Sequence, residues 1–147
     1  MAAWRWRNVP LPEPHLGAIA AGVALGFFLP WRLWSTPRLG HLLGWPLLMV
    51  GVALGAWSVL AAGQEDLERS ASLVVRGPYD FSRNPMYLAW HLLYAGIAFV
   101  LGAAWLLVLL PIVLLLTHLV IRGEEARLDS RHGEMYREYR GRVRRYL

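Results

Sequence analysis

The chain has 147 residues, of which 56% are hydrophobic and 17% are charged, and its formal net charge is +5. Soluble domains are typically about 25% charged, so this composition and the mean hydropathy of +0.37 indicate a membrane protein with one domain, residues 1–147. The lack of cysteine excludes disulfides and thiolate metal sites. The basic residues flank apolar segments, so we interpret them as contacts to anionic lipid headgroups rather than to nucleic acid.

Four apolar segments follow one another along the chain, at residues 16–31, 41–62, 85–101 and 104–121. A helix needs roughly 20 residues to cross the hydrocarbon of a bilayer. The second segment has that length, and the other three lie near the lower limit. We therefore predict an all-α, polytopic membrane protein with about four transmembrane helices.

The third and fourth segments are separated by Gly102 and Ala103 alone, so they are predicted to form a tight antiparallel hairpin. This hairpin belongs to the half of the domain formed by residues 64–147. Residues 1–63 are predicted to form an N-terminal helix pair.

Two further features concern helix packing. The pentapeptide GVALG occurs at residues 22–26 and again at 51–55, and small residues four positions apart let helix backbones approach closely. Pro111 lies in the middle of the fourth segment, where it is predicted to kink the helix or to free a backbone carbonyl.

The placement of arginine predicts the orientation in the membrane. With four spans, both ends of the chain lie on one side. That side receives the arginines before the first segment, those of the 63–84 loop and eight from Arg122 to Arg145. The opposite side receives only Arg32 and Arg38. Because arginine is enriched on the cytoplasmic side, both termini and the 63–84 loop are predicted to be cytoplasmic.

Residues 122–147 are too polar to span a bilayer. Their first part reads as a continuation of the fourth helix, which Gly133 is expected to interrupt. The remainder alternates tyrosines with arginines and is predicted to form a helix on the cytoplasmic side or along the membrane surface.

Two histidines, His91 and His118, lie inside the third and fourth segments. A buried histidine commonly bonds a neighbouring carbonyl, and a metal site would need a third ligand at suitable spacing. We predict no metal site.

The stretch RGPYDFSRNPMYLAW, residues 76–90, begins the third segment with an anion-binding pattern. Pro85 suits the first position of a helix and Asn84 its N-cap. The free N–H groups that follow attract an anion, to which Arg83 adds a charge-assisted contact. Tyr79 and Tyr87 offer aromatic faces and hydroxyls.

Glu124 and Glu125 lie at the other end of the same hairpin. Side chains of adjacent residues point about 100° apart on a helix, so we expect one to face the bundle and the other to face water, Arg127 or Arg131. The inward carboxylate can accept from an ammonium or from ribose hydroxyls. With the anion site opposite, the pair suits a zwitterionic ligand such as S-adenosylmethionine.

The two stretches GPYDFSRNPMYLAW and RGEEARLDSRHGEMYREYRGRVRRYL resemble the isoprenylcysteine carboxyl methyltransferase and phospholipid methyltransferase superfamily. The resemblance covers about the C-terminal half of the chain. The matching positions are Gly77, Tyr79, Arg83, Asn84, Pro85 and Tyr87, followed by Glu124, Glu125, Leu128, Gly133, Tyr136 and Tyr139.

This resemblance implies an integral membrane enzyme that transfers a methyl group from S-adenosylmethionine to a lipid-borne acceptor. One departure is Asn84, where the family usually has histidine; asparagine keeps a hydrogen-bonding amide but does not titrate near neutrality. Arg83 is included for its charge-assisted contact to an anion. The residues expected at the cofactor are then Gln64, Ser72, Leu73, Val74, Tyr79, Arg83, Asn84, Pro85, Met86, Tyr87, Glu124 and Glu125.

The acceptor is expected to enter from the bilayer between helices and to resemble either an isoprenylcysteine carboxylate or a phospholipid amine. Arg122, beside the glutamates, is the candidate catalytic-site residue that holds an anionic headgroup; the alternative is a snorkelling arginine that anchors the helix end. Two other functions remain open at this point: a membrane reductase of the sterol-reductase type that uses NADPH, and a non-catalytic small membrane protein.

Overall fold

The computed structural model describes residues 13–63 and 73–147. The described parts are helical and contain no β-strand, which confirms the all-α prediction. The elements are α1 (Glu13–Phe28), α2 (Pro37–Gly63), the short 3-10 helix η2 (Gly77–Asp80), α3 (Pro85–Leu101), α4 (Ala104–His132) and α5 (Glu134–Arg142).

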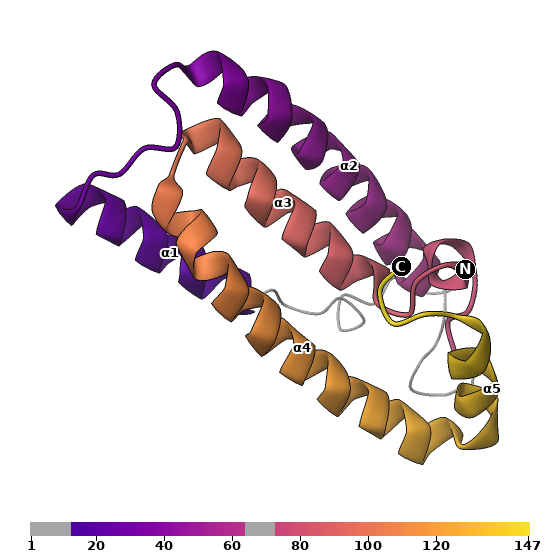
Figure 1. Ribbon diagram of the computed structural model, residues 1–147. Coiled ribbons are helices and arrows are strands. Elements are labelled where there is room, and N and C mark those ends of the chain that lie inside the picture. Colours follow the sequence, from indigo (N-terminus) through magenta and orange to yellow (C-terminus); the bar gives the residue numbers. More distant parts are fainter. Residues whose placement is uncertain (1–12, 64–72) are drawn as a thin grey trace.

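The four longer helices run roughly along one axis (Figure 1). α2 packs along α3, α1 packs against α4, and α3 and α4 form the hairpin that joins the two pairs. As predicted, the hairpin turns at Gly102, whose backbone is left-handed with φ +60°. Its N–H donates to the carbonyls of Ala98 and Phe99.

Glycines bring α2 and α3 into close contact. A Cβ added to Gly44 would lie 2.8 Å from the carbonyl oxygen of Gly96, and one added to Gly51 would lie 2.9 Å from Leu93 Cγ. Gly22 faces Leu106 in the same way, whereas a Cβ at Gly26 would meet nothing within 4 Å. The first glycine of each GVALG copy is therefore a packing position, while the second is not tightly packed.

The hairpin turn and the connection between α1 and α2 close one end of the bundle. The Leu33 N–H donates to the Gly102 carbonyl at 2.9 Å, and the Ala104 N–H donates to the Trp31 carbonyl at 3.3 Å. Trp105 Nε1 donates to the Leu29 carbonyl at 2.7 Å. These bonds hold the turn in place. The candidate site lies at the other end of the hairpin.

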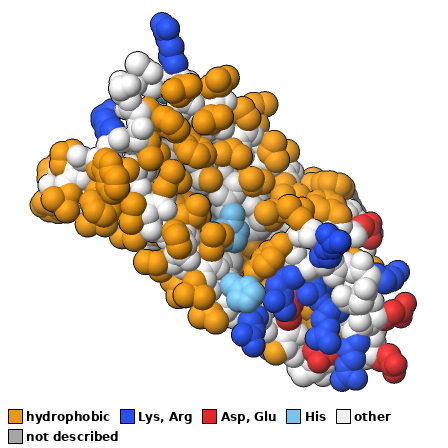
Figure 2. All heavy atoms as spheres, in the orientation of Figure 1, with side chains coloured by type: hydrophobic (Ala, Val, Ile, Leu, Met, Phe, Trp, Pro, Cys, Tyr) orange, Lys and Arg blue, Asp and Glu red, His pale blue; other side chains and the backbone are white. Residues whose placement is uncertain are grey.

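The core between α3 and α4 is formed by Tyr94, Ala98, Leu106 and Val113, and the Tyr94 hydroxyl donates to the Leu106 carbonyl at 2.8 Å. Most of the remaining helix surface is apolar and exposed, and the basic side chains gather at the end that carries α5 (Figure 2). Within the described residues, α2 and α4 are long and apolar enough to cross a membrane, while α1 and α3 are shorter apolar helices. The four-span topology stays a prediction.

The part of the chain after the fourth apolar segment behaves as the sequence predicts in two respects. α4 continues beyond the fourth segment to His132, and Gly133 ends it with φ +53°. Pro111 lies inside this helix, and the kink or freed carbonyl expected there stays a prediction. α5 was expected to lie on the cytoplasmic side or along the membrane surface, but its Tyr136 and Tyr139 are buried against the rest of the protein. Met135 on the same helix is exposed.

Candidate functional site

A cavity of about 290 Å³ opens at the end of the molecule where α4, α5, η2 and the start of α3 meet. Ten of the twelve residues expected at the cofactor line it; the other two, Gln64 and Ser72, lie outside the described residues. The ten are Leu73, Val74, Tyr79, Arg83, Asn84, Pro85, Met86, Tyr87, Glu124 and Glu125.

The start of α3 is held differently from the expectation. Asn84 occupies the N-cap position, but its side chain makes no capping hydrogen bond. Its amide Nδ2 donates instead to the backbone carbonyl of Arg145 at 3.1 Å, and its own N–H donates to Ser82 Oγ at 3.2 Å. The residue that replaces the family's histidine therefore links the start of α3 to the segment after α5.

Glu124 faces the cavity and is held by one tyrosine. The hydroxyl of Tyr87, a buried residue in the first turn of α3, donates to Glu124 Oε1 at 2.8 Å. This bond crosses from α3 to α4 and fixes a half-buried carboxylate at the cavity wall. The carboxylate can accept hydrogen bonds from an ammonium or a hydroxyl group.

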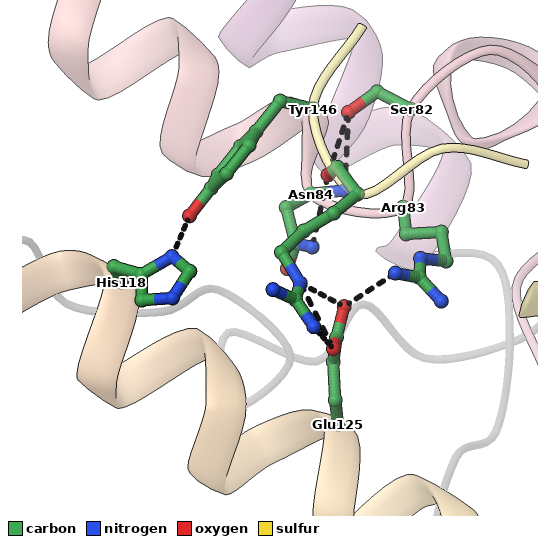
Figure 3. Close-up of polar contacts among 7 residues, drawn as sticks. Ser82, Arg83, Asn84, His118, Glu125 and Tyr146 are labelled. Carbon is green, nitrogen blue, oxygen red and sulfur yellow. Dashed lines mark hydrogen bonds and ion pairs between the residues drawn. The ribbon is translucent and has the colours of Figure 1, made fainter.

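Glu125 is buried and paired with two arginines. Arg145 donates from Nε to both carboxylate oxygens at 3.1 Å, and from Nη2 to Oε2 at 2.8 Å. Arg83 Nη2 lies 3.2 Å from Oε1, as Figure 3 shows. Both glutamates thus line the cavity, rather than one facing solvent, and only Glu124 is left without a cationic partner among these contacts.

Arg83 lines the cavity and holds unpaired donors buried beside it. Its side chain is only 8% exposed, and among the described residues Nε and Nη1 have no hydrogen-bond partner. Buried guanidinium donors without partners are costly, and a carboxylate is the group that best satisfies them.

The aromatic wall of the cavity includes Tyr79 and Tyr139. The Tyr139 hydroxyl donates to the Tyr79 carbonyl at 2.8 Å and ties α5 to η2. Burial and, to a smaller extent, the nearby charge of Glu124 raise the pKa of Tyr79 to about 12, so this phenol is neutral at physiological pH.

Six lining residues were not proposed as site residues: Ala62, Leu128, Arg131, His132, Tyr136 and Tyr139. Three of them continue the cavity-facing stripe of α4, because Leu128, Arg131 and His132 follow Glu124 and Glu125 at helical spacing. These three residues could have been predicted from the sequence by this helical spacing. Leu128, Tyr136 and Tyr139 were already positions of the family motif, which gave them no role.

Three other residues singled out in the sequence lie outside the cavity. Arg122 is exposed on α4 and does not line it. His91 Nδ1 lies 2.6 Å from the Tyr87 carbonyl, the kind of bond expected for a buried histidine. His118 Nδ1 lies 2.7 Å from the Tyr146 hydroxyl.

Comparison with known families finds that the family model for phospholipid methyltransferase matches residues 39–135. The match begins in α2 and ends in the first turn of α5, so it reaches further toward the N-terminus than the resemblance in the C-terminal half. Comparison with curated proteins found no match, and comparison with solved structures found none.

Proposed function

Because the chain belongs to the phospholipid methyltransferase family, we propose that it transfers a methyl group from S-adenosylmethionine to a lipophilic acceptor held in the membrane. Family membership supports methyl transfer to a lipid substrate. The observation that supports the choice of donor is the cavity, which is lined by Arg83, a residue with two buried, unpaired donors, and by Glu124.

These residues fit a zwitterionic donor. Arg83 Nε and Nη1 would bind its carboxylate, and Glu124 would accept from its ammonium group or its ribose hydroxyls. Tyr79, Tyr87 and Tyr139 present aromatic surface, which suits a purine ring and a sulfonium centre. The volume of about 290 Å³ is close to the lower end of ordinary ligand pockets, roughly 300–1,000 Å³.

When bound, S-adenosylmethionine supplies a methyl group on a positively charged sulfur. The acceptor atom forms the new bond to carbon while the sulfur–carbon bond breaks and its electron pair returns to sulfur. Since the leaving thioether is neutral, the protein's tasks are to position the reactants and to exclude water. Arg83 and Glu124 would fix the two ends of the donor, and the tyrosine wall would exclude water.

The acceptor is proposed to reach the donor from the bilayer, with Arg122 as the contact for an anionic headgroup. Arg122 is exposed on α4 next to the fully buried Ile121, just beyond the apolar part of the helix. This is also where a snorkelling arginine would sit, so the two roles are separated by substrate dependence. A headgroup contact predicts that Arg122→Gln raises the KM for the acceptor and leaves the KM for the donor unchanged.

The proposed function is tested by titrating the purified protein with S-adenosylmethionine and, separately, with NADPH in a calorimeter. We expect binding of S-adenosylmethionine alone. Binding of NADPH alone would support a reductase, and binding of neither would contradict any role for this cavity in methyl transfer.

The acceptor class is identified by incubating membranes that contain the protein with methyl-labelled S-adenosylmethionine and separating lipids from proteins. Label in an amine-bearing phospholipid indicates a phospholipid substrate. Base-labile label in a prenylated protein or peptide indicates a carboxyl ester.

A further inference from the structure

Residues 143–147, which we call the strap, run from the end of α5 back across the start of α3 (Figures 1 and 3). The Arg83 N–H donates to the Arg144 carbonyl at 2.9 Å, and Asn84 Nδ2 donates to the Arg145 carbonyl at 3.1 Å. These bonds link residues 61 positions apart in the sequence. Two consecutive residues of the cavity wall are therefore hydrogen-bonded to the strap.

The strap also carries Arg145, the arginine that forms an ion pair with the carboxylate of Glu125. The guanidinium of Arg145 contacts both oxygens of this carboxylate, while Arg83 reaches only one of them, at 3.2 Å. A planar guanidinium prefers to bind a carboxylate through two parallel hydrogen bonds. As long as Arg145 holds both oxygens, Arg83 keeps its Nε and Nη1 groups out of such a pair.

A further contact fixes Tyr146, near the far end of the strap. The hydroxyl of Tyr146 lies 2.7 Å from Nδ1 of His118 on α4, more than one helical turn away from Glu125. The strap therefore connects the beginning of α3 with two positions on α4. It lies beyond residue 135, where the family match ends.

We propose that the strap is part of the methyl-donor site, and that Arg145 and Asn84 are positioning residues that keep the free donors of Arg83 available to the donor's carboxylate. This inference rests on the proposed function. Arg145 does so by occupying Glu125, and Asn84 by holding the backbone from which Arg145 projects. The role of Asn84 requires only a neutral amide N–H, so it does not need the imidazole found in the family.

The test is Arg145→Gln, compared with Arg142→Gln as a control of the same charge change at an exposed position at the end of α5. Without Arg145, Arg83 is expected to turn onto Glu125 and leave the cavity. The dissociation constant and KM for S-adenosylmethionine should then rise at least about tenfold, while kcat at saturating donor changes little. The control should resemble the wild type.

A purely structural role predicts a different pattern. It would lower the fraction of active protein, so kcat would fall with the donor KM unchanged, and that result would overturn the proposal. The double variant Glu125→Gln/Arg145→Gln decides further, because it removes the carboxylate that would capture Arg83. We expect it to bind the donor more tightly than Arg145→Gln alone; equal or weaker binding contradicts the mechanism.

Docking of the strap is measured independently of the donor by limited trypsin cleavage after Arg144, followed by mass spectrometry. Asn84→Ala should accelerate this cleavage relative to the wild type, and an unchanged rate would show that the strap is not held as described. If the wild-type protein binds no S-adenosylmethionine but Asn84→Ala still accelerates cleavage, the proposed function fails while the docking of the strap stands.

Discussion

At the scale of single residues, the two adjacent glutamates have different surroundings. Glu125 is surrounded by guanidinium groups from Arg83 and Arg145, so its charge is balanced within the protein. Glu124 accepts a hydrogen bond from the neutral hydroxyl of Tyr87, and its carboxylate stays available to a ligand. Of the two carboxylates, Glu124 is therefore the one that should control affinity for a positively charged donor.

Tyr87→Phe tests the hydrogen bond between Tyr87 and Glu124. Removing the hydroxyl frees Glu124 to rotate and removes a hydrogen bond to a charged group, which is worth about 1.5–3 kcal/mol. Affinity for S-adenosylmethionine in calorimetry should fall about tenfold. Tyr94→Phe is the matched control, because its hydroxyl bonds the Leu106 carbonyl in the core. The control should lower the unfolding temperature but leave donor affinity unchanged. Equal donor affinities in the wild type, Tyr87→Phe and Tyr94→Phe would exclude a role in donor binding for the Tyr87–Glu124 hydrogen bond.

The titration of Tyr79 tests whether it lies near Glu124. Its pKa is raised to about 12 by burial and by the negative charge of Glu124. Because the folded state holds the phenol proton more tightly than the unfolded state, stability from this group is fully present below about pH 10 and is lost as pH rises toward 12. Tyr79→Phe should therefore reduce the loss of stability over this pH range.

Tyrosinate absorbance separates the effect of Glu124 on the pKa of Tyr79 from the effect of burial. Because Glu124 also contacts the Tyr87 phenol, the Tyr79 component is taken as the difference between absorbance titrations with and without Tyr79→Phe. In Glu124→Gln this component should move to lower pH, because the repelling charge is gone. Glu138→Gln removes a carboxylate from the exposed side of α5 and serves as the control. A shift of the same size in both variants would mean that Glu124 does not act on Tyr79 directly.

Much of the site could be predicted from sequence, because the residues with ligand-binding chemistry lie in two short motifs. Partners within the site could not be predicted in the same way. Helical spacing says nothing about Arg145, which reaches Glu125 from 20 positions away and Asn84 from 61. N-cap preference likewise pointed to the backbone of α3 as the partner of Asn84, and the strap competes successfully for its amide.

At the scale of elements, the α2–α3 interface depends on glycines that allow the two backbones to touch. Sequence could identify small residues in apolar helices but could not say which of them face a neighbour. Gly22 and Gly51 do, whereas Gly26 lies in open space although it belongs to the same pentapeptide pattern. The difference arises from the direction of each helix face, which only the packed structure fixes.

Gly44→Ala should therefore destabilise the protein. Its Cβ would lie 2.8 Å from the Gly96 carbonyl oxygen and 2.8 Å from the Val100 nitrogen, and backbone atoms cannot move aside as a flexible side chain can. Overpacking of this kind costs about 1–3 kcal/mol, seen as a lower unfolding temperature in detergent.

Gly26→Ala is the comparison, because alanine there meets nothing within 4 Å. In a helix interior, alanine is favoured over glycine by about 0.5–1 kcal/mol, so this change should be neutral or stabilising. Equal destabilisation by the two changes would contradict the assignment of Gly44 to the interface.

At the scale of the whole molecule, the two ends of the bundle differ. One end is closed by backbone bonds between the α3–α4 turn and the connection after α1, and the other holds the cavity, α5 and the strap. Basic side chains gather at the cavity end (Figure 2). The hairpin and its ends could be predicted from sequence because apolar runs end abruptly there. The number of spans could not, because α1 and α3, with 16 and 17 residues, are about 24–26 Å long against a hydrocarbon thickness of about 30 Å.

We predict that all four helices cross the membrane, with the cavity on the cytoplasmic side. The chain has no cysteine, so single cysteines can be introduced at Thr36, before α2, and at Ser130, near the end of α4. Both positions are exposed. The connection after α1 adjoins the start of α4 through the bridge between Arg32 and Ala103, and the 29 residues of α4 extend roughly 43 Å from there.

An impermeant maleimide added to intact cells should label Thr36→Cys, and Ser130→Cys should react only after the membrane is opened. The physical reason is the arginine asymmetry, which retains the basic end of the bundle on the cytoplasmic side. The reverse labelling pattern would place the cavity outside the cytoplasm, away from the supply of S-adenosylmethionine, and would count against the proposed donor. Labelling of both positions from the same side would show instead that α4 does not span the bilayer.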